Sequence, residues 1–146
     1  MFKGVFTATI TPFDNDERID FKSFEKLLDF QLESKVNGLV PCASTGEASS
    51  LDEEEYLDVI RFCIEKSKGK KKVIAGFGTN STYKTLKLLK KINDLKLDAI
   101  LVITPYYNRP PQIGIIEHFR IISQNTDHKI IIYNIPSRTG VNINPE

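Results

Sequence analysis

Hydrophobic residues along the chain follow two alternating patterns. Short runs of consecutive apolar and often β-branched residues predict strands at residues 5–10, 38–42, 72–76, 99–104 and 129–133. Between them, apolar residues recur at three- and four-residue steps, which predicts amphipathic helices around residues 24–32, 56–64, 86–92 and 115–122. Successive runs start 27 to 34 residues apart. This is the spacing of a strand, a crossover helix and two loops, so the sequence predicts a β-α repeat.

The predicted order β-α-β-α-β-α-β-α-β is compatible with two α/β architectures. The runs at 100–103 and 130–133 do not alternate with polar residues, as expected for a parallel sheet covered on both faces. Such strands occur in a doubly wound open sheet and in a (β/α)8 TIM barrel. A complete barrel needs about 250 residues. We therefore expect residues 1–146 to be an incomplete N-terminal portion of a single barrel domain, with roughly the first four βα units and the fifth strand.

The open-sheet alternative depends on the glycines at Gly76 and Gly78, which follow a predicted strand and precede a predicted helix. A dinucleotide-binding loop carries a third glycine, lies on the first strand and has an acidic partner after the next strand. Here the third glycine is missing and the pair lies on the third strand. The acidic partner is missing as well, because the fourth strand continues into Thr104-Pro105-Tyr106. The pattern favours the barrel.

Composition restricts the function further. The chain carries 20 basic and 19 acidic residues among 146, so no strong field attracts nucleic acid or an anionic membrane. Its apolar runs are much shorter than the roughly 20 residues of a membrane helix. Cys42 and Cys63 match no redox or zinc spacing, and we expect two buried thiols, no metal and no cofactor. Without an export signal, we expect a cytoplasmic protein.

The charges near the second helix suggest where it begins and ends. Residues 50–53 are interpreted as a capping box, followed by glutamates at the positive end of the helix dipole. Lys66 and Lys68 would lie at the negative end. The lysine cluster at residues 66–72 is therefore interpreted as solvated surface and not as a phosphate site.

Hydroxyl groups, phenols and arginines collect after the predicted strands, where barrel active sites form. Ser44 and Thr45, with backbone N–H groups freed by Gly46, could hold a carboxylate. Arg138 could bind a second carboxylate with its two-pronged guanidinium. Tyr133, Ser44 and Tyr107 could pass a proton along a chain of hydroxyls. Taken singly, a tyrosine at a strand end is more often a core cap, and Tyr107 with its neighbour could equally be an interface patch.

These residues resemble the dihydrodipicolinate synthase and N-acetylneuraminate lyase family of pyruvate-dependent class I aldolases and lyases. The resemblance covers residues 4–146 and is carried by five segments: Thr11-Pro12-Phe13, Ser44-Thr45-Gly46-Glu47, Gly76-x-Gly78-x-Asn80, Thr104-Pro105-Tyr106-Tyr107-Asn108-Arg109-Pro110 and Tyr133-Asn134-Ile135-Pro136-Ser137-Arg138-Thr139-Gly140. The tyrosine pair and Arg138 resemble the synthases of this family more than the sialic-acid lyases.

The resemblance implies a reaction and a role for each residue. The reaction is the condensation of pyruvate with aspartate semialdehyde in lysine and diaminopimelate biosynthesis. Tyr133 would be the acid and base, Ser44 and Tyr107 would complete the proton relay, Thr45 would hold the carboxylate of pyruvate, and Arg138 that of the aldehyde. The family also implies a homodimer, usually paired into a tetramer, in which Tyr107 reaches a neighbouring subunit's site.

Two departures from the family limit what we expect of this chain. Ser44 stands where the family most often has threonine, so the relay should keep its hydroxyl with looser geometry. The family's Schiff-base lysine lies on the strand after the last one present, and no lysine of this chain is expected at a strand's carboxyl end. We therefore expect the chain alone not to catalyse the condensation. Its fifth strand would be an apolar edge that favours association.

Regulation and two alternative functions complete the expectations. Asn80 and Tyr106 match an effector site for lysine in the family, but Lys84 replaces its acidic ligand, so we expect weak feedback. One alternative is a sialic-acid or keto-deoxy-sugar aldolase of the same fold. The other is a non-catalytic remnant that acts only as an interaction partner.

Overall fold

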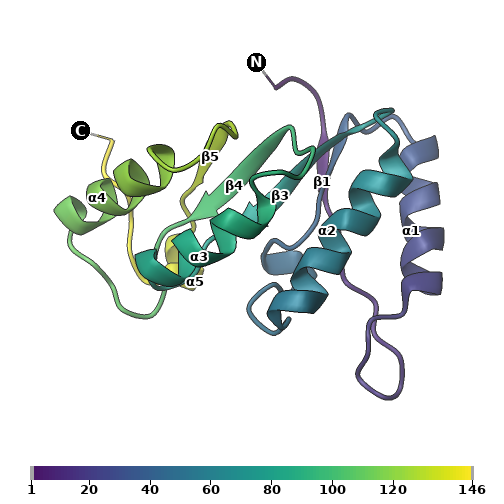
Figure 1. Cartoon of the computed structure of the whole chain (residues 1–146), viewed down its shortest axis with the longest axis horizontal. Helices are drawn as coiled ribbons and strands as arrows, with labels where there is room; N and C mark the ends of the chain where they lie inside the picture. The colour runs from purple at the N-terminus through teal and green to yellow at the C-terminus, as the bar shows by residue number, and fades with distance from the viewer. Residues whose placement is uncertain (1, 146) are drawn as a thin grey trace. The chain divides into compact units, whose positions relative to one another are not determined.

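The structure is a computed structural model that describes residues 2–145, and its strands and helices alternate as the hydrophobic pattern predicts (Figure 1). The elements are β1 (Phe6–Ala8), α1 (Phe21–Glu33), β2 (Gly38–Val40), the 3-10 helix η1 (Ser44–Gly46), α2 (Glu53–Ser67), β3 (Lys72–Phe77), α3 (Thr82–Ile92), β4 (Ala99–Ile103), α4 (Gln112–Ser123), β5 (Ile130–Tyr133) and α5 (Pro136–Thr139). The chain divides into two compact units: residues up to 76 with 96–98, and residues 77–95 with 99 onward. Within residues 2–145, no helix is long and apolar enough to cross a membrane.

The first unit contains a parallel ladder covered by two helices. Strand β2 pairs in parallel with β1 and with β3, and Leu39 in β2 is fully buried. Helices α1 and α2 lie side by side (Figure 1). Between them, the ring of Phe62 packs 5.1 Å from that of Phe21 and 5.7 Å from that of Phe24, measured between centroids. Because apolar surface from distant parts of the sequence is buried here, the periodic residues of both helices form one core.

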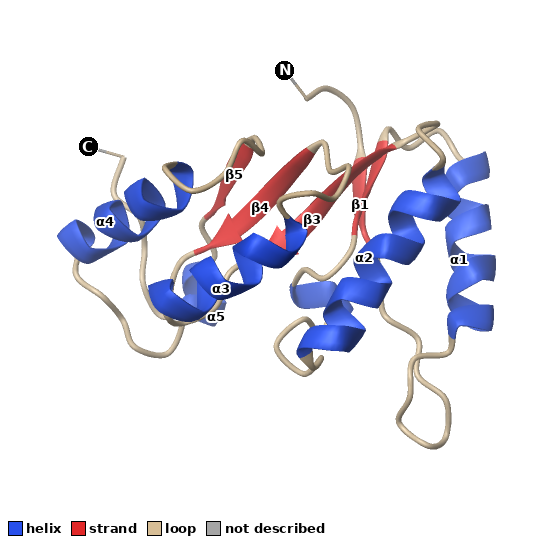
Figure 2. Cartoon of the chain, in the orientation of Figure 1, coloured by secondary structure: helices blue, strands red, loops and turns tan. Residues whose placement is uncertain are grey.

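The second unit contains the parallel pair β4 and β5, drawn as adjacent red arrows in Figure 2. Ile100 lies opposite Ile130 and Ile103 lies opposite Tyr133. In β4, Ile100 is fully buried, whereas Ile132 in β5 remains 55% exposed. The prediction that both runs are covered on both faces is therefore correct for much of β4 and wrong for β5. Within its unit, the described ladder joins β5 to β4 alone, which leaves β5 as an apolar edge.

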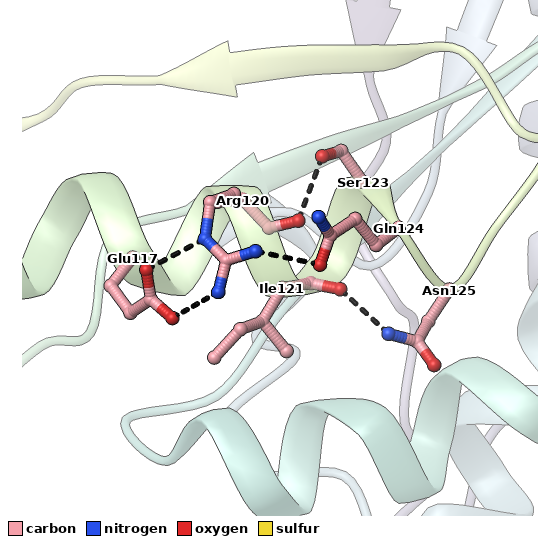
Figure 3. A network of polar contacts seen from close by, with 6 residues as sticks. All are labelled: Glu117, Arg120, Ile121, Ser123, Gln124 and Asn125. Atoms are coloured by element: carbon pink, nitrogen blue, oxygen red, sulfur yellow. Dashed lines mark hydrogen bonds and ion pairs between the residues drawn. The ribbon is translucent and has the colours of Figure 1, made fainter.

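The C-terminal end of α4 is fixed by a network of side chains (Figure 3). The guanidinium of Arg120 donates to the carboxylate of Glu117, one turn earlier. The side chain of Asn125 donates to the carbonyl of Ile121 at 2.8 Å, and the carbonyl of Asn125 accepts from the side chain of Asn93 at 3.1 Å. The end of α4 is thereby tied to the end of α3, which fixes the start of the loop into β5.

The cap of α2 differs from the prediction. Asp52, not Ser50, is the N-cap: its carboxylate accepts from the backbone N–H of Glu55 at 2.9 Å, and the Glu55 side chain accepts from the N–H of Asp52. The predicted box at residues 50–53 is wrong because both Ser50 and Asp52 precede a glutamate by three positions, and only the path of the chain selects one. The glutamates in the first turn and Lys66 in the last turn are confirmed.

The strands also end at slightly different residues than predicted. Strand β1 covers only Phe6–Ala8, and β2 ends at Val40 because Pro41 has no N–H to donate and Cys42 is left-handed, with φ 54°. Strand β3 continues one residue further, to Phe77. The helix α5 is not predicted by the pattern, because a single turn is too short to show periodicity.

Candidate functional site

The turn after β2, in the first unit, presents the predicted hydroxyl pair. Ser44 and Thr45 begin the helix η1, with Ser44 half-buried and Thr45 exposed. Neither hydroxyl forms a hydrogen bond with another residue of the described chain. The N–H of Gly46 itself is not available to a ligand, because it donates to the carbonyl of Ala43 at 3.0 Å and closes the turn. A carboxylate at this turn would therefore meet hydroxyl donors and not the N–H of Gly46.

Close backbone contacts hold this turn in place. The hydroxyl of Thr11 donates to the carbonyl of Gly46 at 2.8 Å. In β3, Gly76 lies so close that a Cβ added to it would be 2.6 Å from the Cα of Ala43. The phenol of Tyr56 donates to the carbonyl of Gly76 at 2.7 Å, inside the core. Close packing against the turn thus explains why position 76 is glycine, and a dinucleotide-binding loop is not needed to explain it.

The two cysteines are buried, as predicted. Cys42 is 2% exposed and its thiol donates to the carbonyl of Tyr56 at 3.7 Å, while Cys63 is fully buried. Burial raises the pKa of the Cys63 thiol to about 12 and also raises the pKa values of Cys42 and the Tyr56 phenol. All three groups therefore stay protonated near neutral pH. They pack in the core and are not reactive nucleophiles or bases.

The loop after β4, in the second unit, has a strained backbone. Tyr107 and Arg109 are in the left-handed region, with φ 70° and 48°, a conformation that is uncommon for residues other than glycine. Between them, the side chain of Asn108 donates to the carbonyl of Asn80 at 2.8 Å and so ties this loop to the one after β3. Tyr107 is 87% exposed. Strain of this kind is concentrated at functional sites, where the surroundings hold it in place.

The loops after β4 and β5 enclose a hollow of about 350 Å³. Its lining is polar and contains no acidic residue: Tyr107, Arg109, Ser137, Arg138, Thr139 and Gly140. Neither arginine forms an ion pair or a hydrogen bond within the described chain. The structure thus brings Tyr107 and Arg138 to one hollow with two unpaired positive charges. Tyr133, half-buried at the end of β5, is outside its lining, and Ser44 and Thr45 belong to the first unit.

A short helix and a network of amides hold Arg138. Helix α5 ends at Gly140, whose φ is +74° and whose N–H donates to the carbonyl of Pro136 at 2.9 Å. The chain then returns to α4, where the side chain of Gln112 donates to the carbonyl of Asn142 at 2.8 Å. The side chain of Asn134 donates to that of Asn142, also at 2.8 Å. These bonds fix the ends of the segment that carries Arg138.

Arg109 also lines the hollow; the sequence marks it, with Arg138, as an arginine after a strand but gives it no individual role. Its position in a polar loop after a strand was the available signal, but the sequence does not distinguish a lining arginine from a solvated one. The left-handed backbone at Arg109 and the return of the 134–140 segment beside it bring its side chain to the hollow.

The fold and these loops define the class of protein. Parallel βα units with polar loops at the carboxyl ends of their strands form a β/α-barrel architecture. Over residues 1–146 the chain matches the model of the dihydrodipicolinate synthetase family, and it belongs to that family.

Individual relatives agree with this assignment. A 4-hydroxy-tetrahydrodipicolinate synthase from Endomicrobium trichonymphae is 48% identical over 145 residues, 99% of this chain and 50% of the relative. The solved dihydrodipicolinate synthase from Thermotoga maritima is 47% identical, with a TM-score of 0.93 over 98% of this chain and 48% of that one. The enzyme from Acinetobacter baumannii, solved as a complex with pyruvate, is 40% identical with a TM-score of 0.94, over 98% and 49%.

These likenesses confirm the predicted fold. The chain spans about half the length of the curated relatives it matches. Its five parallel strands and intervening helices are the first four βα units and the fifth strand of a (β/α)8 TIM barrel.

Proposed function

We propose that this chain carries the carboxylate-binding and proton-relay half of a 4-hydroxy-tetrahydrodipicolinate synthase. The enzyme would condense pyruvate with aspartate semialdehyde in lysine and diaminopimelate biosynthesis. The observation that carries the proposal is the hollow in the second unit, where Tyr107 and Arg138 lie together without an acidic residue. The relatives named as synthases and the pyruvate complex of one of them support it.

Two residues would hold the carboxylates of the substrates. The guanidinium of Arg138 is exposed, lines the hollow and has donors in a planar fork, which suits a bidentate bond to the carboxylate of the aldehyde. The free hydroxyl of Thr45 would donate to the carboxylate of pyruvate. A metal is not required for either contact, because both partners are hydrogen-bond donors.

Three hydroxyl groups would move the proton. Tyr133 would act as acid and base, with Ser44 and Tyr107 as the other members of the relay. A free phenol has a pKa near ~10 and is a poor acid or base alone. In a chain of hydroxyls, each group can donate its proton to one neighbour while it accepts a proton from the other. A proton can therefore move along the chain without a long-lived phenolate on either tyrosine.

The amine of the Schiff base would come from outside this chain. The segments that follow the five strands, residues 9–20, 41–52, 78–81, 104–111 and 134–145, contain no lysine. An imine with pyruvate needs an amine at the mouth of the barrel. We therefore infer that residues 1–146 are the N-terminal portion of a single barrel domain and do not catalyse the condensation alone. After incubation with pyruvate and borohydride, the chain should carry no adduct in a mass spectrum; a stable adduct would refute this inference.

The role of Arg138 is tested by binding. We expect Arg138→Gln to weaken the affinity for succinic semialdehyde about tenfold, since it removes a charge-assisted bidentate pair. The affinity is measured by following backbone amide resonances in a titration. Arg61→Gln is the matched control, because Arg61 is an exposed arginine on α2 that pairs with Asp58. Equal affinities of the Arg138 variant and the unchanged chain would contradict the proposal.

We further propose that the protein is a cytoplasmic homo-oligomer, a dimer or tetramer, with no nucleic-acid or membrane partner. The support is Tyr107, a large aromatic side chain that is 87% exposed in a single chain. Burial of such a side chain stabilises an interface. Sedimentation velocity of the protein and of Tyr107→Ala should show a lower association state for the variant.

Feedback by lysine is proposed to be weak. Lys84, in the first turn of α3, places a positive charge where the family has an acidic ligand for the effector's amine. Two like charges repel, so lysine should bind poorly. Half-inhibition of a complete form of the enzyme by submillimolar lysine would contradict this proposal.

A further inference from the structure

Arg109 packs against the backbone of Gly140, although 31 positions separate them. A Cβ added to Gly140 would lie 2.7 Å from Nε of Arg109 and 3.4 Å from its Cζ and Nη2. The guanidinium of Arg109 therefore occupies the side of Gly140 on which a Cβ would stand. Both residues line the hollow that contains Arg138.

Two separate features favour glycine at position 140. Its φ of +74° is strained for any residue with a side chain, and the space that a Cβ would need is occupied by Arg109. Gly69 provides the comparison: it has the same φ of +74°, but nothing lies within 4 Å of an added Cβ. An alanine at Gly69 thus reports the backbone strain alone, while an alanine at Gly140 reports the strain and the displacement of Arg109.

We propose that Arg109 is a positioning residue for Arg138. Its guanidinium presses on the Gly140 end of α5, and Arg138 stands on the same single turn of helix, two positions earlier. Backbone bonds and the buried hydroxyl of Thr139 fix the turn of α5 itself, but no hydrogen bond within the described chain fixes the direction of the exposed Arg138 guanidinium. With Arg109 against Gly140, helix α5 is held so that Arg138 lines the hollow. This role rests on the proposed function, in which Arg138 binds the carboxylate of the aldehyde.

Packing, and not charge alone, is what this arrangement uses. Lysine keeps the positive charge but lacks the flat guanidinium that lies on the Gly140 backbone. A role of Arg109 as a point charge for the anion would be largely preserved by Arg109→Lys, whereas a direct bidentate role is distinguished by the double-mutant cycle with Gly140. A positioning role would be lost in Arg109→Lys as it is in Arg109→Ala.

The test is a titration of the whole chain with succinic semialdehyde, followed by amide resonances and by the side-chain Nε–H of Arg138. We expect Arg109→Ala and Arg109→Lys each to weaken the affinity about fivefold and to increase the motion of the Arg138 side chain. Gly140→Ala should weaken it by a similar factor, while Gly69→Ala lowers the thermal midpoint and leaves the affinity unchanged. Wild-type affinity in Arg109→Lys would overturn the proposal.

A double-mutant cycle supplies the independent measurement. Once Arg109 is alanine, the added Cβ at Gly140 no longer displaces a guanidinium and only the backbone strain remains, so Gly140→Ala should weaken binding by clearly less than the fivefold expected in the unchanged chain. Independent effects that multiply to about 25-fold would overturn the proposal. If Arg138→Gln itself leaves the affinity unchanged, the proposed function fails. If Arg138→Gln weakens binding and the Arg109 variants do not, only the positioning role fails.

Discussion

The turn after β2 and the loop after β4 occupy equivalent places in the second and fourth βα units, yet they are held in different ways. The turn is fixed by buried backbone contacts: Gly76 has no room for a Cβ, and its carbonyl accepts from the buried phenol of Tyr56. The loop is exposed, carries left-handed Tyr107 and Arg109, and is tied through the amide of Asn108.

This difference separates stability from ligand binding. In the turn, the hydroxyls of Ser44 and Thr45 stand on a backbone that the core holds rigid, so changes around it should affect folding. In the loop, unpaired arginines stand on a strained and accessible backbone, so changes there should affect binding more than folding. Four substitutions or conditions test this difference between the turn and the loop.

The largest effect is expected for Gly76→Ala. The added Cβ would be 2.5 Å from the carbonyl carbon of Cys42, which is backbone and cannot swing away. We expect a loss of about 3 kcal/mol or more in the free energy of unfolding, measured by urea denaturation. The matched control is Gly114→Ala in α4, where the closest atom would be at an ordinary 3.4 Å and the variant should be neutral or slightly more stable. Equal stabilities of the two variants would show that the turn is not rigidly packed.

A smaller loss is expected for Tyr56→Phe. The variant keeps the ring in the core and removes only the donor to the carbonyl of Gly76, at 2.7 Å. An unmade buried hydrogen bond costs about 1.5 kcal/mol. Urea denaturation measures the loss, and Tyr83→Phe, in which an exposed tyrosine is changed, is the control. The contrast would be weakened if both variants were equally stable.

Acid should destabilise the second unit through His118. This side chain is 2% exposed; its Nδ1 bonds to the hydroxyl of Thr82 at 2.9 Å, and its Nε2 has no partner among the described residues. Burial lowers the pKa of His118 below its ordinary value of 6.5. The unfolded chain therefore binds a proton first, so this contribution to stability is complete above pH 6.5 and falls as the pH drops below it.

The loss between pH 7 and pH 5.5 is at most about 1.3 kcal/mol, the limit for one full proton taken up on unfolding. Denaturation curves at several pH values measure the slope. His118→Gln cannot take up this proton and should flatten the slope by that amount. If the slope is unchanged in the variant, the folded and unfolded chains take up a proton at His118 equally over this pH range.

The smallest effect, with the opposite sign, is expected for Tyr107→Asn. Asparagine tolerates the left-handed backbone better than tyrosine, and the tyrosine ring is 87% exposed, so little burial is lost. We expect a gain of about 0.5 kcal/mol in stability together with loss of the proposed relay. The thermal midpoint of the monomeric chain measures the gain. A lower midpoint would show that the loop is not strained by this residue.

Most of the fold could be predicted from the sequence, because its signals are local. Apolar runs and three- or four-residue steps depend on neighbouring residues, and they placed all five strands and the four longer helices. The boundaries were less certain: β2 stops at Val40 because of the proline and the left-handed residue that follow. Periodicity gave no sign of α5, a single turn.

For the candidate site, the sequence pointed to the loops that follow the strands but not to how their side chains are arranged. Tyr107 and Arg138 were both singled out, and they line one hollow. The sequence also does not show that the N–H of Gly46 is bonded within the turn. The role of Arg109 stayed hidden, since no local pattern shows that its guanidinium meets a glycine far along the chain.

By itself, the sequence determined the β-α order, the family motifs and the kinds of side chain at the strand ends. These follow from hydrophobic periodicity and residue chemistry, which act over a few neighbouring positions. Only the folded chain shows that Gly76 must be glycine, that Arg109 lies against Gly140, and which arginines share the hollow. The physical reason is close packing: backbone and side chains more than thirty positions apart compete for the same space, and only the folded chain shows which of them meet.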